Sequence, residues 1–260
     1  MRPMTMRTAT ERMAPRPSLA RLAAVELRKL ADTRAGIALL GAVALAAAGT
    51  VAVQLVVGEP RARTVAALFS AALVPAGVLL PIVGILSVTG EWAQRGALVT
   101  FALVPRRERV VAAKLLAVGI VALLTVDVCL GAAAAGHAVS VATGHGGGGS
   151  RITADALGEA MAGEVLLALL GVGFGLLLRS STLAIAVYLV VPSAWSILAA
   201  TVGWLHGWAG WLSLDAAVGP LQQGASLPAQ GWARVAAVAG LWLLLPLLAG
   251  LARLARTEVG

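Results

Sequence analysis

The sequence predicts an all-α, polytopic membrane protein with six transmembrane helices. Of its 260 residues, 59% are hydrophobic and only 12% are charged, about half the charged fraction of an average soluble domain. The mean hydropathy is +0.90. Several uncharged stretches reach the length of roughly 20 residues that a helix needs to cross a bilayer. So little polar surface cannot cover a water-soluble globule, and we expect lipid to be the main solvent.

The charged residues divide the chain into one membrane domain, 18–256, between short tails at 1–17 and 257–260. The first tail is basic and rich in proline, and we expect it to be disordered. Residues 18–34 mix apolar and charged side chains at helical spacing, which suits either a helix on the membrane surface or a plain juxtamembrane helix. The predicted spans are 36–57, 64–90, 115–135, 158–178, 180–205 and 233–252, the fourth of which must include part of 156–164 because the uncharged stretch after Glu164 is short.

The distribution of Lys and Arg predicts the orientation of these spans. Six spans place both termini on the same side of the membrane. If that side is cytoplasmic, it carries every Lys and Arg except Arg61, Arg63, Arg151 and Arg234, as the positive-inside rule requires. We therefore expect both termini in the cytoplasm, and we interpret the net charge of +8 as a topology signal, with no nucleic-acid partner.

The sequence offers no constellation for catalysis or metal binding. It contains no H-E-x-x-H and no G-x-S-x-G motif. The glycine-rich stretch 143–151 lacks the lysine of a phosphate-binding loop, and a flexible linker explains it better. His137 and His145 lack a third ligand nearby. The single cysteine, Cys129, lies in an apolar run and is interpreted as a packing residue.

Asp127 is the one acidic residue in the predicted third span. An ionisable group near the middle of a membrane costs at least about 2.5 kcal/mol on insertion scales. Two interpretations stay open: a hydrogen bond between helices, or a site on a translocation or proton path.

Small residues and tryptophans mark two further helix faces. Gly171, Gly173 and Gly175, with Ala168 one turn earlier, predict a close approach between helices. Trp204, Trp208 and Trp211 share one face of a helix that leads into the external segment 205–231. Because Trp favours the membrane interface, we expect this segment to dip into the outer leaflet, either as a simple anchor or as part of a gate.

The cytoplasmic stretch between the second and third spans carries the most specific pattern. It begins with Glu91 and Gly96, continues through a leucine-containing turn, and reaches Pro105, Arg106 and Arg107 before Lys114 opens the third span. A short helix ending before Pro105 would present apolar side chains in the cytosol, and apolar surface surrounded by charge is typical of a docking site.

This arrangement resembles the permease subunits of type-2 ABC exporters, and the Ala-, Gly- and Arg-rich composition is closest to actinobacterial members. The resemblance covers about 18–256, and the segment around Asp215 is similar to the external re-entrant region of that family. Ala97 departs from the pattern, because Thr or Ser commonly follows the glycine.

The resemblance implies a bacterial plasma-membrane exporter subunit that is not itself an enzyme. Its partners would be a cytosolic ABC ATPase, which holds Mg-ATP, and a second permease copy or homologue; this chain would bind no cofactor. The ATPase-coupling residues implied are Glu91, Trp92, Arg95, Gly96, Leu98, Phe101, Pro105, Arg106 and Arg107. Two alternatives stay open: a secondary transporter driven by an ion or proton gradient through Asp127, and a membrane-embedded enzyme or non-transporting membrane protein.

Overall fold

The computed structural model describes residues 18–60, 63–93, 107–146, 148, 152–224 and 227–256. Every regular element in these ranges is helical, and six helices are long and apolar enough to cross a membrane. The chain is an all-α, multi-pass membrane protein, as its composition predicts. The spans are α2 (Arg34–Val57), α3 (Val65–Ala93), α5 (Arg107–Ala142), α6 (Ala154–Leu178), α7 (Ser181–Thr201) and a last span at Ala229–Leu254.

The observed bounds differ from the predicted ones where charged residues find partners inside the protein. Helix α5 extends well beyond 115–135 at both ends, and its first turns include Lys114, which is buried. The fourth span includes Glu159 and Glu164 within α6, as its short uncharged stretch requires. Helix α7 ends at Thr201, because Val202 adopts an extended backbone conformation that stops the helix.

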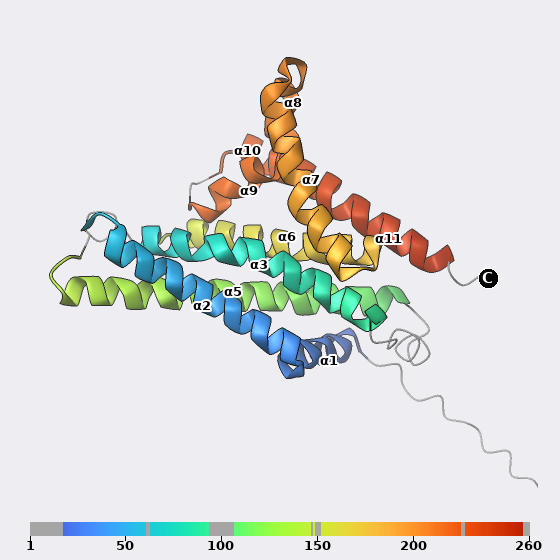
Figure 1. The fold of residues 1–260 in the computed structure, drawn as a ribbon, viewed down its shortest axis with the longest axis horizontal. Coiled ribbons are helices and arrows are strands. Elements are labelled where there is room, and N and C mark those ends of the chain that lie inside the picture. The colour runs from blue at the N-terminus through green and yellow to red at the C-terminus, as the bar shows by residue number, and fades with distance from the viewer. Residues whose placement is uncertain are drawn as a thin grey trace, which may run out of the picture.

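The segment predicted to be a surface helix forms α1 (Leu19–Asp32). Its first turn is capped by Ser18, whose Oγ accepts the Arg21 N–H at 3.2 Å. One residue, Thr33, separates α1 from α2, and Thr33 Oγ1 caps α2 by accepting the Gly36 N–H at 3.1 Å. The chain therefore bends sharply between two capped helices, which places α1 against the end of the bundle where α5 begins (Figure 1).

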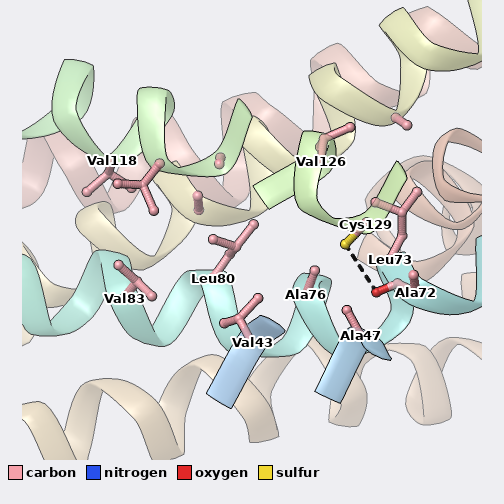
Figure 2. Packing of buried hydrophobic residues seen from close by; sticks show 14 of the residues in the cluster. Val43, Ala47, Ala72, Leu73, Ala76, Leu80, Val83, Val118, Val126 and Cys129 are labelled. Carbon is pink, nitrogen blue, oxygen red and sulfur yellow. Dashed lines mark hydrogen bonds between the residues drawn. The ribbon is translucent and has the colours of Figure 1, made fainter. Parts of the chain in front are cut away.

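Helices α2, α3, α5 and α6 form the main bundle, with α2 crossing obliquely over α3 and α5 (Figure 1). Small and β-branched side chains fill its interior, among them Ala47, Ala76 and Val126 (Figure 2). Cys129 lies in the same cluster, where its Sγ is 3.4 Å from the Ala72 carbonyl oxygen (Figure 2). The prediction that Cys129 is a packing residue is confirmed.

The closest packing in the bundle joins α3 to α6. A Cβ atom added at Gly171 would collide with the backbone carbonyl of Pro81, and one at Gly84 would collide with the carbonyl of Ala168. Ala168 itself is fully buried. Gly171 and Gly175 of the predicted small-residue face therefore let the backbones of α3 and α6 meet without side chains between them. Gly173, predicted on the same face, lies instead against the last span.

The second half of the chain packs against the other side of α6. Helix α7 starts beside the bundle, and its far end stands away from the other spans together with η2 (Gly203–Leu205) and α8 (His206–Leu212) (Figure 1). Helix α9 (Leu214–Gln222) then returns to α6 and is followed by α10 (Ala229–Val238). The described chain ends near the same end of the bundle as α1 (Figure 1).

The last span changes its helical geometry in the middle. Between α10 and α11 (Leu245–Arg256) lies a π-helical segment, η3 (Ala239–Leu244). Pro246, two residues after the end of η3, has no N–H to donate to the carbonyl four residues earlier, which favours this wider turn. The irregular segment directs Trp242 toward α8, where its Nε1–H donates to the Leu212 carbonyl at 2.9 Å.

The α3–α6 contact makes a testable prediction about stability. Gly171→Ala should lower the free energy of unfolding by about 1–3 kcal/mol, because the new methyl group must displace the backbone of α3. The measurement is the thermal unfolding midpoint of the purified protein in detergent, followed by tryptophan fluorescence.

Gly119→Ala is the matched control, because a Cβ at Gly119 in α5 meets no atom within 4 Å. Its midpoint should stay at the wild-type value or rise, since Ala is the better helix former. Equal midpoints for the two variants would contradict the close contact.

Candidate functional site

Two groups of polar side chains lie inside this apolar fold, and the first is an ion cluster at the end of the bundle that carries α1. Lys114 of α5 is only 4% exposed, and its Nζ lies 2.6 Å from Glu26 Oε2 of α1. The same Nζ donates to the Ser87 carbonyl of α3 at 2.8 Å. Lys29 Nζ lies 2.7 Å from Glu26 Oε1. We call Glu26, Lys29, Ser87 and Lys114 the α1 ion cluster.

The α1 ion cluster joins α1, α3 and α5 through polar groups whose separation would cost free energy. A charge-assisted hydrogen bond to a buried group is worth about 1.5–3 kcal/mol, and the low dielectric of the interior strengthens it. Helices α3 and α5 are the ones that precede and follow residues 94–106. A force on residues 94–106 would therefore act on α3 and α5. Lys114 joins these two helices to each other and to α1.

In the sequence, the predicted coupling residues lie between two members of this cluster, Ser87 and Lys114. Glu91 and Trp92 belong to the last turn of α3, and Arg107 is the first residue of α5. The prediction of a short apolar helix before Pro105 lies outside the described residues. So do the predicted coupling residues Arg95, Gly96, Leu98, Phe101, Pro105 and Arg106.

The second polar group lines a pocket of 280 Å³ between α3, α6, α7 and α9, which we call the α9 pocket. Val74 and Val78 of α3 and Leu189 of α7 form an exposed rim, so the pocket opens at the side of the bundle. Its polar lining residues are Tyr188, Ser193, Asp215 and Gln222; the others are Gly77, Leu167, Pro192, Leu214, Val218 and Gly219.

Helix α9 brings Asp215 and Gln222 to this pocket. Asp215 lies in the first turn of α9, where a carboxylate is favoured by the helix dipole, and Ser196 Oγ donates to its Oδ2 at 3.3 Å. Gln222 is the last residue of α9, and its Nε2 donates to Glu164 Oε1 of α6 at 2.8 Å. The two ends of a short helix are thus fastened to α7 and α6.

Glu164 and Glu159 hold α9 and the segment before α10 to α6. Glu164 is completely buried, so leaving it without the Gln222 amide would cost several kcal/mol. Glu159 Oε1 accepts the backbone N–H of Leu227 at 2.9 Å, just before α10. For each carboxylate, Oε2 has no hydrogen-bond partner among the described residues.

Most of these residues carry no clear signal in the sequence. Glu159 and Glu164 lie within the predicted fourth span, 158–178, where acidic residues are a signal of function, but the sequence does not indicate their partners. Nothing in the sequence points to the pairing of Lys114 with Glu26, because 88 residues separate them. Tyr188, Ser193 and Gln222 likewise carry no local pattern.

Asp127, the predicted translocation-path residue, lies apart from both polar groups. It is on the exposed side of α5, next to the exposed Leu124 and Val128. It does not line the α9 pocket, and no hydrogen bond joins it to another described residue. Its predicted role stays a prediction.

The predicted external residues occupy two different environments. Trp204 and Trp208 are 77% and 61% exposed, at the end of the segment that stands away from the bundle (Figure 1). Trp211 is partly covered, and the Arg234 guanidinium lies 5.9 Å from its ring centroid. Asp215 belongs to the α9 pocket. The exposed tryptophans retain the character expected of an interfacial anchor.

Comparison with known proteins adds no family assignment. No protein-family model matches the chain, and no curated protein matches it. Within the described ranges, His, Cys, Asp and Glu form no group of three or more that could hold a metal ion. The α1 ion cluster and the α9 pocket are therefore the features from which we infer the function.

The α1 ion cluster predicts a specific loss of stability. Glu26→Gln should lower the free energy of unfolding by about 1.5–3 kcal/mol, because a buried lysine loses a charge-assisted hydrogen bond. It should also loosen α1, which would raise the rate of limited proteolysis at Arg21 and Arg28. The measurements are the unfolding midpoint and the digestion rate in detergent.

Asp32→Asn is the matched control on the same helix, because Asp32 is exposed and forms no ion pair with any described residue. It should change neither quantity measurably. If both variants accelerate proteolysis equally, the cluster does not hold α1.

Proposed function

We propose that this chain is the permease subunit of an ABC exporter in the bacterial plasma membrane, driven by a separate ATPase. The observation that carries the proposal is the α1 ion cluster, in which Lys114 joins α1, α3 and α5 next to the segment 94–106. A subunit that is pushed by a partner needs a rigid connection at the point of contact. The resemblance of 91–107 to a coupling segment supports the same location.

A mechanical path leads from the α1 ion cluster to the α9 pocket along a single helix. Ser87 and Val78 belong to the same helix, α3, about 14 Å apart at 1.5 Å per residue. Closure of the ATPases on ATP would push residues 91–104, and α3 would carry the displacement to the pocket wall. ATP would thereby favour one of two arrangements of the spans, as differential binding requires.

The apolar exterior agrees with a subunit that is surrounded by lipid and by a second permease. Helices α2 and α7 are largely uncovered in the single chain, with Leu45 75% and Ile197 66% exposed. The α9 pocket opens beside α7. A second copy seated on these helices would close the pocket from the side and leave a path between the two subunits.

The coupling proposal predicts which residues transport depends on. Glu91→Ala and Gly96→Pro should each abolish export and substrate-stimulated ATP hydrolysis, with normal membrane insertion, because both change the segment that receives the push. The measurement is ATP hydrolysis and uptake by inverted vesicles that contain the permease and its ATPase.

Glu108→Ala is the control, because Glu108 is an exposed acidic residue in the first turn of α5. It should retain nearly full activity. Full export in both coupling variants would contradict the proposal. Gradient-driven transport without any ATPase, abolished by Asp127→Asn, would instead establish the secondary-transporter alternative.

The proposed orientation makes an independent prediction about labelling. In a background with Cys129 replaced by Ala, Arg95→Cys should react with a membrane-impermeant maleimide only after the cells are opened. Glu59→Cys, in the exposed connection between α2 and α3, should react in intact cells. Labelling of Arg95→Cys from outside would overturn both the orientation and the coupling role.

A further inference from the structure

The α9 pocket has a chemical character of its own, because its lining offers acceptors and negative charge. None of its thirteen lining residues is Lys, Arg or His, and Asp215 is the single charged one. No ion pair joins Asp215 to a cation in the described part of the chain. The nearby Arg234 is instead stacked toward the Trp211 ring and lines a different pocket, with Ala216 and Pro220.

Two hydrogen-bond donors around the α9 pocket are committed to the protein. The Ser193 hydroxyl donates to the Leu189 carbonyl at 2.8 Å, so its oxygen remains an acceptor. One N–H of the Gln222 amide donates to Glu164 at 2.8 Å, and the amide carbonyl remains an acceptor. Together with the Asp215 carboxylate, these oxygens favour a ligand that brings donors and positive charge.

The rest of the pocket surface suits an apolar body. Nine of the thirteen lining residues are aliphatic, proline or glycine. Tyr188 adds a ring that is held edge-on against Phe174, with 6.1 Å between the ring centroids, and aromatic rings attract organic cations. Small-molecule sites commonly combine such an apolar wall with a few directed polar groups.

We propose that the α9 pocket binds amphipathic organic cations, such as protonated aralkyl amines, with Asp215 as the counter-charge. The cationic end lies against Asp215, and the apolar end lies against Val78, Leu167 and Val218. The proposal names the substrate class of the exporter and so rests on the proposed function. Binding itself requires only this chain.

The test compares three probes of the same shape: phenylbutylammonium, phenylbutanol and phenylbutanoate. The complete permease, in lipid nanodiscs without any ATPase, is titrated with each probe, and empty nanodiscs measure partition into lipid. We expect the cation to bind at least about tenfold more tightly than the alcohol, a typical effect of one ion pair shielded from water, and the anion to bind more weakly than either. An anion that binds as tightly as the cation would overturn the proposal.

Three variants separate the pocket from a general attraction of cations to acidic protein. Asp215→Asn should remove the preference for the cation over the alcohol, because the amide keeps the shape and loses the charge. Asp155→Asn, which neutralises an exposed carboxylate in the first turn of α6 and outside the pocket, should leave all three affinities unchanged. Ser193→Phe should weaken both the cation and the alcohol by filling the opening. An equal loss in the two aspartate variants, or none in Asp215→Asn, would overturn the assignment.

A second readout distinguishes this inference from the function on which it rests. When the permease is reconstituted with its ATPase, the cation should stimulate ATP hydrolysis in the wild type and not in Asp215→Asn. If the cation binds but no ATPase couples to the permease, the exporter proposal is contradicted and the assignment of the pocket is supported. If an ATPase couples to the permease but the permease binds no cation, the exporter proposal is supported and the cation site is overturned.

Discussion

The rest of the structure depends on the direct contact between the backbones of α3 and α6. Gly84 and Gly171 remove the side chains that would keep these helices apart, so α6 becomes the most enclosed of the spans. One face of α6 completes the cluster shared with α2, α3 and α5, and another supports α7, α9 and the last span. In lipid, where apolar side chains gain little from meeting one another, such close packing is a main source of helix association.

This close packing explains how the fold tolerates ionisable groups inside an apolar bundle. Lys114 and Glu164 are both buried, and each is placed against a group on another helix. Lys114 contacts Glu26 and a backbone carbonyl, and Glu164 accepts from Gln222. Buried polar groups of this kind specify one arrangement of helices, because any other arrangement leaves a charge or a donor without its partner. Asp127, in contrast, lies at the exposed surface of α5.

The two polar groups divide the proposed transport cycle between them. The α1 ion cluster lies where a cytosolic partner would act, and the α9 pocket lies where a ligand would sit, with α3 extending between them. Glu164 fixes the position of Gln222, so the buried carboxylate acts on the pocket as a positioning residue. The exposed Trp204 and Trp208 do not line the pocket, and interfacial anchoring is their simplest role.

Local sequence predicts the helical class, the six spans, the inclusion of 158–164 in the fourth span, and a close approach at Gly171. These features follow from local composition, from helical periodicity and from the thickness of a bilayer, which act on each segment separately. The folded chain was needed to show that Lys114 pairs with Glu26, that Gln222 meets Glu164, and that Asp215 rather than Asp127 lines a pocket. Those pairings join residues far apart in the chain, and they depend on helix rotation and close approach, which the hydrophobicity of a single segment does not encode.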